Sequence, residues 1–319
     1  MKKLLQIREL STVAILVAEI AFFTWYLWPE AGRAHPFLNA ENALLILKYS
    51  SIYGIAAVGA AVVIISGGID LAPGAVMALA GVVTSGLFVE AQWPLGVAMG
   101  AGLLIGLASG LLSAALVILA RLPPFIATLG VMGITRGAAF IITEGRYFDV
   151  SSTLVGGWRP LGLPADWVAP LVMLFFAVVF QILMTRFQWG RAVFATGGNE
   201  TAALFSGISL GRIKTSVYVL SGVLAAVSGI VLVVVQGQGK ADLATGYELD
   251  IIASAVVGGA SLSGGRGSVM GAVLGTLIFG VLRNALPQIP GATFYDRLIV
   301  GLVVIVIVVM DQMLLKKAE

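Results

Sequence analysis

Long apolar runs recur along the whole chain and are separated by short polar segments. A run of about 20 residues is long enough to cross roughly 30 Å of hydrocarbon as a helix. The pattern predicts about ten spans, with an error of about two, at residues 10–28, 43–66, 73–90, 94–120, 124–142, 167–185, 215–235, 251–262, 268–285 and 294–313. The eighth run is too short to cross alone. We therefore expect an all-α protein: one polytopic transmembrane helical bundle, residues 1–319, with interrupted or re-entrant segments.

Composition agrees with this fold class. Apolar residues make up 59% of the chain and charged residues 11%, against about 25% charged residues in soluble domains. The chain has no cysteine, which excludes disulfides and thiolate chemistry, and its single histidine excludes a histidine cluster for a metal. No metal site is expected.

The ends of the chain and its loops predict an orientation. Residues 10–28 follow a basic N-terminus, as a signal peptide would, but about 19 apolar residues exceed the usual hydrophobic region of about 7–15. We therefore expect a retained first helix. With the N-terminus inside, most of the 19 Lys and Arg residues lie in cytoplasmic segments. Both termini are then cytoplasmic.

Glycine spacing predicts how the helices pack. Gly102, Gly106 and Gly110 repeat every four residues and therefore share one helix face. In lipid, such a face lets two backbones approach closely, where no hydrophobic drive brings helices together.

The segment SGGIDLAPG, residues 66–74, interrupts one of the most apolar stretches. Backbone that is not helical survives at membrane depth only when it is buried in protein or lines a wet cavity. We expect a helix to start at Leu71, with Pro73 in its first turn and Asp70 as its N-cap. Asp70 contacting a solute in the pathway is the alternative, and the two roles are compatible.

A second segment, residues 258–271 (GGASLSGGRGSVMG), has a similar pattern. Gly258 and Gly259 match Gly67 and Gly68, with a leucine three residues after the second glycine of each pair. Paired interrupted segments in two halves of a chain are typical of the pathway of a transporter. We therefore expect both segments to line or support a translocation pathway.

The most informative polar stretch lies between the sixth and seventh predicted spans, at residues 186–214. Asn199 is a natural N-cap, Glu200 suits the first turn and Gly207 is a natural stop, so a two-turn helix, ETAALFS, is predicted. Seven residues are too few for a helix that is stable alone in water. The helix should dock onto a partner through its small residues, Ala202, Ala203 and Ser206, with Leu204 or Phe205 as an anchor. Packing against its own bundle is the alternative.

Several chemistries are missing from the sequence. No G-x-x-x-x-G-K-[ST] motif occurs, so the chain has no P-loop of its own. Apart from charges at the ends of the predicted spans, the embedded charges are limited to Glu19, Lys48, Asp70 and Arg136, which is few for a proton-coupled carrier. Lys48 is expected to reach the interface. Arg136 fits either an internal ion pair or a helix end.

Four stretches together resemble a known family: SGGIDLAPGAVMALAG (66–81), PPFIATLG (123–130), GGNETAALFSGI (197–208) and YELDIIASAVVGGASLSGGRGSVMGAVLG (247–275). The chain resembles, over nearly its whole length, the permease subunits of bacterial ABC importers for monosaccharides, in the ribose/xylose/galactoside branch. Ala72 and Pro73 depart from the family, which more often has Ser-Val there. The interrupted segments together with this resemblance predict translocation-pathway or re-entrant residues at Gly67, Gly68, Asp70, Pro73, Phe125, Thr128, Gly258 and Gly259, although the departure at Ala72-Pro73 means that the family gives no detailed role at that turn.

The resemblance also implies partners. Two permeases, identical or related, form the pathway, and a periplasmic sugar-binding protein delivers the solute. A cytoplasmic subunit binds ATP and Mg²⁺, so this chain needs no cofactor and is not itself an enzyme. The subunit docks on a coupling helix, matched here by Asn199, Glu200, Ala202, Ala203, Leu204, Phe205, Ser206 and Gly207. Membrane lipid surrounds the bundle, and no nucleic acid is involved. The resemblance further implies that this membrane is a bacterial inner (plasma) membrane.

Other functions stay open on the sequence alone. An importer for nucleosides, autoinducer-2 or branched-chain amino acids has related permeases. A secondary carrier or channel working alone belongs to a different class. An intramembrane enzyme is disfavoured because the sequence offers no nucleophile–base pair.

Overall fold

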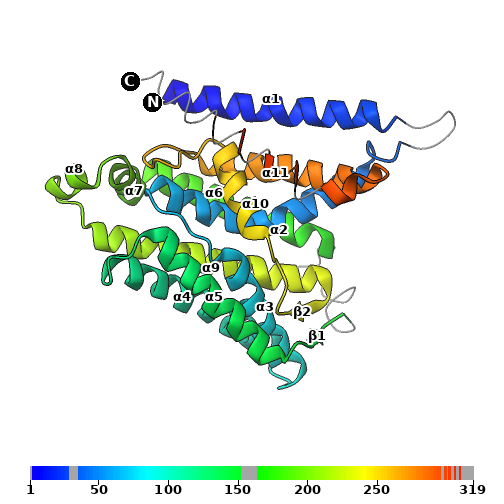
Figure 1. Cartoon of the computed structure of the whole chain (residues 1–319), viewed down its shortest axis with the longest axis horizontal. Helices are drawn as coiled ribbons and strands as arrows, with labels where there is room; N and C mark the ends of the chain where they lie inside the picture. The colour runs from blue at the N-terminus through cyan, green and yellow to red at the C-terminus, as the bar shows by residue number, and fades with distance from the viewer. Residues whose placement is uncertain are drawn as a thin grey trace.

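The computed structural model describes residues 2–28, 35–151 and 164–295, with isolated positions between 298 and 309. These residues form a helical bundle in which α1 lies along one side, next to α11 (Figure 1). The α-helices are α1 (Lys2–Tyr26), α2 (Ala40–Ile65), α3 (Pro73–Val89), α4 (Leu95–Ile118), α5 (Pro124–Thr143), α6 (Val168–Arg186), α7 (Gln188–Gly198), α8 (Glu200–Phe205), α9 (Leu210–Gln236), α10 (Tyr247–Val257) and α11 (Val269–Ala285). Short 3₁₀ turns cover Ala165–Trp167, Leu286–Gln288 and Ala292–Tyr295.

Six helical segments within the described residues are long and apolar enough to cross a membrane: α2, α4, α5, α6, α9 and Val269–Gln288. Two shorter apolar helices, Leu10–Tyr26 and Pro73–Val89, add to them. The predicted all-α, polytopic class is confirmed. The predicted eighth span is the 11-residue helix α10, which is too short to cross by itself. The predicted span at residues 294–313 falls largely outside the described residues.

The core is built around α2 and α9. Residues 50–66, which form the second half of α2 and its C-cap, are all buried. α9 packs against α2, α3 and α4. The predicted close approach at the α4 glycines is confirmed: a methyl group at Gly106 would lie 2.6 Å from the Cβ of Ala226, and one at Gly110 would lie 2.5 Å from the carbonyl oxygen of Tyr218. Glycine therefore lets α4 contact the backbone of α9 directly.

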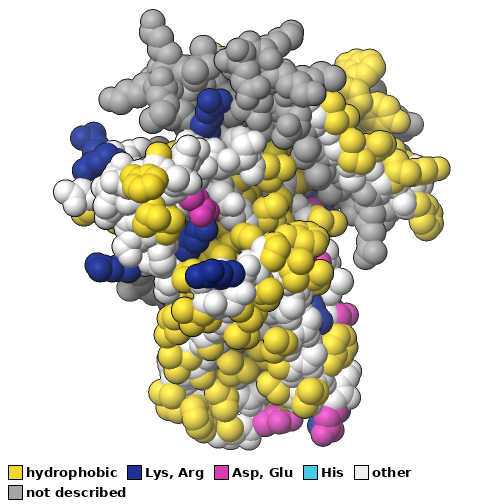
Figure 2. Space-filling view, turned by 60° about the vertical axis from the view of Figure 1, so that its left-hand side comes forward, with side chains coloured by type: hydrophobic (Ala, Val, Ile, Leu, Met, Phe, Trp, Pro, Cys, Tyr) yellow, Lys and Arg dark blue, Asp and Glu magenta, His cyan; other side chains and the backbone are white. Residues whose placement is uncertain are grey.

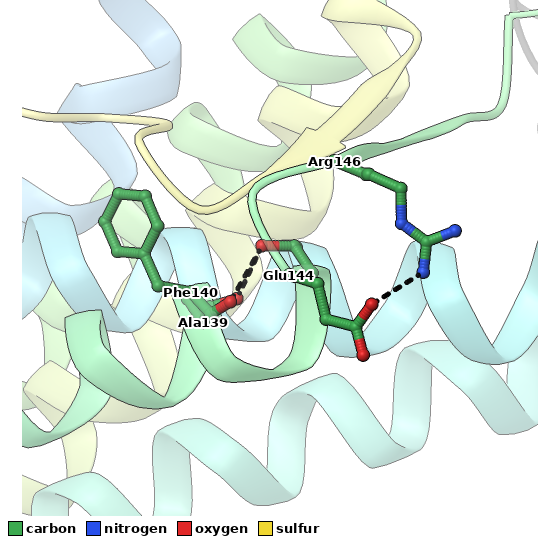
Figure 3. Close-up of polar contacts among 5 residues, drawn as sticks. Ala139, Phe140, Glu144 and Arg146 are labelled. Atoms are coloured by element: carbon green, nitrogen blue, oxygen red, sulfur yellow. Dashed lines mark hydrogen bonds and ion pairs between the residues drawn. The ribbon is translucent and has the colours of Figure 1, made fainter.

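Two short strands, β1 (Tyr147–Asp149) and β2 (Gln238–Lys240), pair antiparallel, with Phe148 opposite Gly239. β1 follows the end of α5, where Glu144 takes a left-handed conformation and its carboxylate lies 3.3 Å from Arg146 Nη2 (Figure 3). β2 directly follows α9, and α8 lies just before the start of α9. Since α9 has 27 residues, the strand pair and α8 lie at opposite ends of a helix about 40 Å long.

Candidate functional site

Asp70 lies in the interruption between α2 and α3 and is 4% exposed. One carboxylate oxygen accepts a hydrogen bond from the Ala72 amide at 2.9 Å. The other accepts one from the Ser221 hydroxyl of α9 at 2.7 Å. A buried carboxylate is costly unless hydrogen bonds satisfy it. Asp70 therefore ties the interrupted segment to the central helix of the bundle.

The prediction that Asp70 is the N-cap of a helix starting at Leu71 is wrong. α3 begins at Pro73, and its N-cap is Ala72, which makes no side-chain capping hydrogen bond. Proline at the first helical position lacks an N–H group, so one of the unpaired amides of the helix start is absent. The Asp70 carboxylate instead binds the amide of the capping residue and reaches a partner on another helix.

Thr128 of α5 also contacts this interrupted segment. Its fully buried hydroxyl accepts a hydrogen bond from the Leu71 amide at 3.1 Å and lies 3.2 Å from the Ile69 carbonyl oxygen. The hydroxyl also lies 3.0 Å from the carbonyl oxygen of Pro124. Phe125, predicted as a site residue with it, is 51% exposed. The structure thus joins Thr128, but not Phe125, to the interrupted segment.

The glycines of the first segment have separate reasons to be glycine. Gly67 has φ of +86°, a left-handed conformation that side chains disfavour. Gly68 lies under the side chain of Tyr218, and a methyl group there would lie 2.5 Å from the Tyr218 hydroxyl oxygen. Both positions therefore fix the path of the backbone between α2 and α3.

The second interrupted segment, residues 258–268, follows the short helix α10. Gly258 caps α10, and a methyl group there would overlap the backbone of Gly271 at the start of α11. Gly259 has φ of +97°. The amide of Gly265 donates a hydrogen bond to the carbonyl oxygen of Ile65 at 2.8 Å. The second segment is therefore bonded to the end of α2, directly before the first segment, and its Gly264 packs closely on Gly67.

The first turns of α3 and α10 also meet. A methyl group at Gly74 would lie 2.5 Å from Glu248 Oε2 and 3.4 Å from the Glu248 amide nitrogen. Because the N-terminus of a helix carries a partial positive charge, the Glu248 carboxylate is favourable between two such ends. The sequence pattern alone did not single out Glu248. Its position in the first turn of a helix too short to cross the membrane is the signal that could have found it.

Two charged side chains left open by the sequence have defined partners. Arg136 Nη1 donates hydrogen bonds to the carbonyl oxygens of Ala241 and Leu243, both at 2.7 Å. Arg136 therefore holds the irregular segment that leads into α10. The sequence predicts that Lys48 extends toward the end of its span. Its Nζ forms an ion pair with Asp166, just before α6, at 2.7 Å.

The local signals of α8 are confirmed. The Asn199 side chain accepts a hydrogen bond from the Ala202 amide at 2.9 Å. Gly207 has φ of +81°, and the amides of Gly207 and Ile208 donate to the carbonyl oxygens of Leu204 and Ala203, which is a Schellman motif. The helix is one residue shorter than predicted and ends at Phe205.

The predicted docking face of α8 is only partly available. Ala203 is 3% exposed and packs into its own chain, whereas Ala202 and Ser206 are exposed. Leu204 is 57% and Phe205 86% exposed. Yellow hydrophobic and dark blue Lys and Arg side chains lie together at this protruding end of the molecule (Figure 2). Leu204 and Phe205 therefore leave an apolar pair exposed on this six-residue helix.

The Thr128 contact leads to a direct prediction. Thr128→Val keeps the side-chain shape but removes the partner of the half-buried Leu71 amide, which costs up to about 1–3 kcal/mol. We expect a lower melting temperature of the detergent-solubilised protein, and Thr128→Ser, which keeps the hydroxyl, should melt close to the wild type. Equal melting of the valine variant and the wild type would show that this hydrogen bond does not hold the segment.

Comparison with known proteins decides the family. The family model described as a branched-chain amino acid transport system / permease component matches residues 42–308. The chain belongs to this permease family. The ribose import permease protein RbsC of Escherichia coli (strain K12) is 37% identical over 286 residues, which covers 86% of this chain and 87% of the relative. No solved structure matches the chain significantly.

Other relatives of this permease also carry the names of sugar transport systems. The D-allose transport system permease protein AlsC of Escherichia coli (strain K12) is 33% identical over 285 residues, covering 88% of this chain and 86% of the relative. The xylose transport system permease protein XylH of the same strain is 31% identical over 370 residues, covering 97% and 93%. The resemblance to sugar permeases is confirmed. A permease component works with other components of its system, and these relatives are not themselves enzymes.

Proposed function

We propose that this chain is the transmembrane permease subunit of an ATP-driven monosaccharide importer. The similarity to permeases named for ribose, allose and xylose, over at least 86% of this chain in each case, carries the proposal. In such a system the chain forms the translocation pathway, and a cytoplasmic partner subunit binds ATP and Mg²⁺ and hydrolyses the ATP. No cofactor binds to the permease itself.

The geometry supports a division of labour between α8 and the interrupted segments. The exposed apolar pair of α8, Leu204 and Phe205, suits docking of the ATP-binding subunit on the cytoplasmic side. The pathway runs past the interrupted segments, whose backbone is positioned by Asp70 and Thr128. Both termini are cytoplasmic in this arrangement.

A second permease, identical or related, completes the pathway. α5 is the least buried of the six long apolar segments, at 28% of its apolar window. Its exposed face includes Phe125, beside three glycines with open space around them, Gly130, Gly133 and Gly137. Small residues on an exposed membrane helix suit close contact with another helix. On the outer side, a periplasmic sugar-binding protein delivers the solute, lipid covers the remaining surface, and nucleic acid has no part.

Reconstitution tests the function. The permease is placed in liposomes with its ATP-binding subunit, the binding protein and radiolabelled ribose, allose or xylose. We expect uptake that requires ATP, and none when the ATP-binding subunit is left out. Uptake by the permease alone would instead identify a secondary carrier or channel. ATP-dependent uptake of a nucleoside or a branched-chain amino acid, with no sugar transported, would keep the importer and overturn the substrate class.

A further inference from the structure

Three segments that are distant in the sequence meet through glycine at the end of the bundle that carries α8. They are residues 65–67 at the end of α2, residues 197–198 at the end of α7, and residues 264–265 between α10 and α11. We call this contact the glycine junction, and its members are Gly67, Gly197, Gly198, Gly264 and Gly265. Both interrupted segments of the pathway thus touch the helix that precedes α8.

The junction is closed backbone to backbone. A methyl group at Gly197 would overlap the carbonyl oxygen of Ile65 and lie 2.6 Å from the amide nitrogen of Gly265. A methyl group at Gly264 would lie 2.5 Å from the Gly197 carbonyl oxygen and 2.9 Å from the Gly67 Cα. Cβ atoms do not approach other atoms this closely, so these contacts require glycine.

Conformation explains some of these glycines but not Gly197. Gly67, Gly264 and Gly265 have φ of +86°, +78° and +69°, where side chains are strained. Gly197 lies inside the α-helix α7, where glycine is less stable than alanine by about 1 kcal/mol. The close approach to Ile65 and Gly265 is therefore the reason for glycine at this position.

We propose that the glycine junction transmits movement of α8 to both interrupted segments, with Gly197 as the positioning residue. The proposal rests on the proposed function, in which α8 docks the ATP-binding subunit. Asn199 is both the C-cap of α7 and the N-cap of α8, so any tilt of α8 is passed to the end of α7. Backbone contacts contain no side-chain torsions that absorb such a displacement, and packed contacts of this kind shift as units.

The contacts of the glycine junction lead to the starts of α3 and α11. The Gly265 amide is bonded to the Ile65 carbonyl oxygen at 2.8 Å, and Gly264 packs on Gly67, so the second interrupted segment is held against the start of the first. The first of them carries Asp70, which is bonded to Ser221 of α9. The second leads into α11, whose first turn packs on Gly258. A displacement at α7 therefore reaches the starts of both α3 and α11.

Neighbouring glycines of α7 supply a matched pair of variants. Gly197→Ala introduces the overlap described above, whereas a methyl group at Gly198 meets no atom closer than 4.0 Å. Both changes raise helix propensity equally. We expect Gly197→Ala to keep the ATP-binding subunit bound and to keep basal hydrolysis, while sugar uptake and the stimulation of hydrolysis by loaded binding protein fall at least about tenfold. Gly198→Ala should behave as the wild type.

The outcomes separate this proposal from the function itself. If the wild-type complex moves no sugar, the proposed function fails. If the wild type transports and Gly197→Ala transports as well as Gly198→Ala, the junction proposal alone fails. It also fails if folded Gly197→Ala loses the ATP-binding subunit, because the glycine would then only shape the docking surface.

A second variant decides the matter if Gly197→Ala does not fold. One glycine inserted between Gly198 and Asn199, both exposed, leaves the junction intact and loosens its link to α8. We expect the ATP-binding subunit to co-purify with this variant and the amount of sugar moved per ATP to fall by at least about tenfold. An unchanged ratio would overturn the proposal.

Discussion

Asp70→Leu is expected to abolish recovery of the folded permease. The leucine side chain has the same branched arrangement of four heavy atoms, though it is bulkier, and it offers no acceptor to the Ala72 amide or to the Ser221 hydroxyl, which now bind the carboxylate at 2.9 and 2.7 Å. Leaving each of these buried donors without a partner costs about 1–3 kcal/mol. The sum is a large part of the roughly 5–15 kcal/mol that holds a typical domain together.

The measurement is size-exclusion chromatography of the detergent-extracted protein, followed by thermal melting of the monodisperse fraction. Asp70→Asn is the matched control, because its amide oxygen still accepts one hydrogen bond and the Ser221 hydroxyl can accept from its NH₂ group. Ser221→Ala removes one of the two contacts and should fall between the extremes. A leucine variant that elutes and melts as the wild type does would rule out a stabilising role for the carboxylate.

Features governed by short-range chemistry could be predicted from the sequence. The apolar runs locate the membrane helices because hydrocarbon imposes a minimum length and internal backbone hydrogen bonding. The ends of α8 follow from Asn199 and Gly207, whose side chain and conformation act within a few residues. Glycines spaced by four on α4 predict close helix packing because they lie on one face of the helix, and a face without side chains lets another backbone approach.

Features governed by long-range partners could not be predicted. The partner of Asp70 is 151 residues away in the sequence, so the pattern favoured a local role as a cap. The carbonyl oxygens that bind Arg136 are 105 and 107 residues away. A small residue such as Ala203 is compatible with contact either to a partner subunit or to the helices of its own chain, so the sequence alone places it on the docking face as readily as in the core. Its burial depends on the neighbouring helices of the permease.

The burial of Ala203 also changes which substitution tests docking. A bulky residue at Ala203 would disturb packing within the permease itself, since this side chain is 3% exposed. Phe205 is 86% exposed, so changing it leaves the internal contacts of the chain in place. An exposed aromatic side chain is also the kind of residue that dominates the energy of protein interfaces.

Phe205→Glu is therefore expected to remove the ATP-binding subunit from the purified complex and to abolish sugar uptake. Burying a carboxylate in an apolar groove of the partner costs more than docking can supply unless the charge is paired. The permease should still insert and melt as the wild type does, and Phe205→Leu, which stays apolar, should keep most of the binding. Co-purification and ATP-dependent uptake measured on the three proteins decide the matter. If Phe205→Glu retains the ATP-binding subunit with sugar-stimulated hydrolysis, α8 is not the docking element, and coupling must run through another part of the cytoplasmic face.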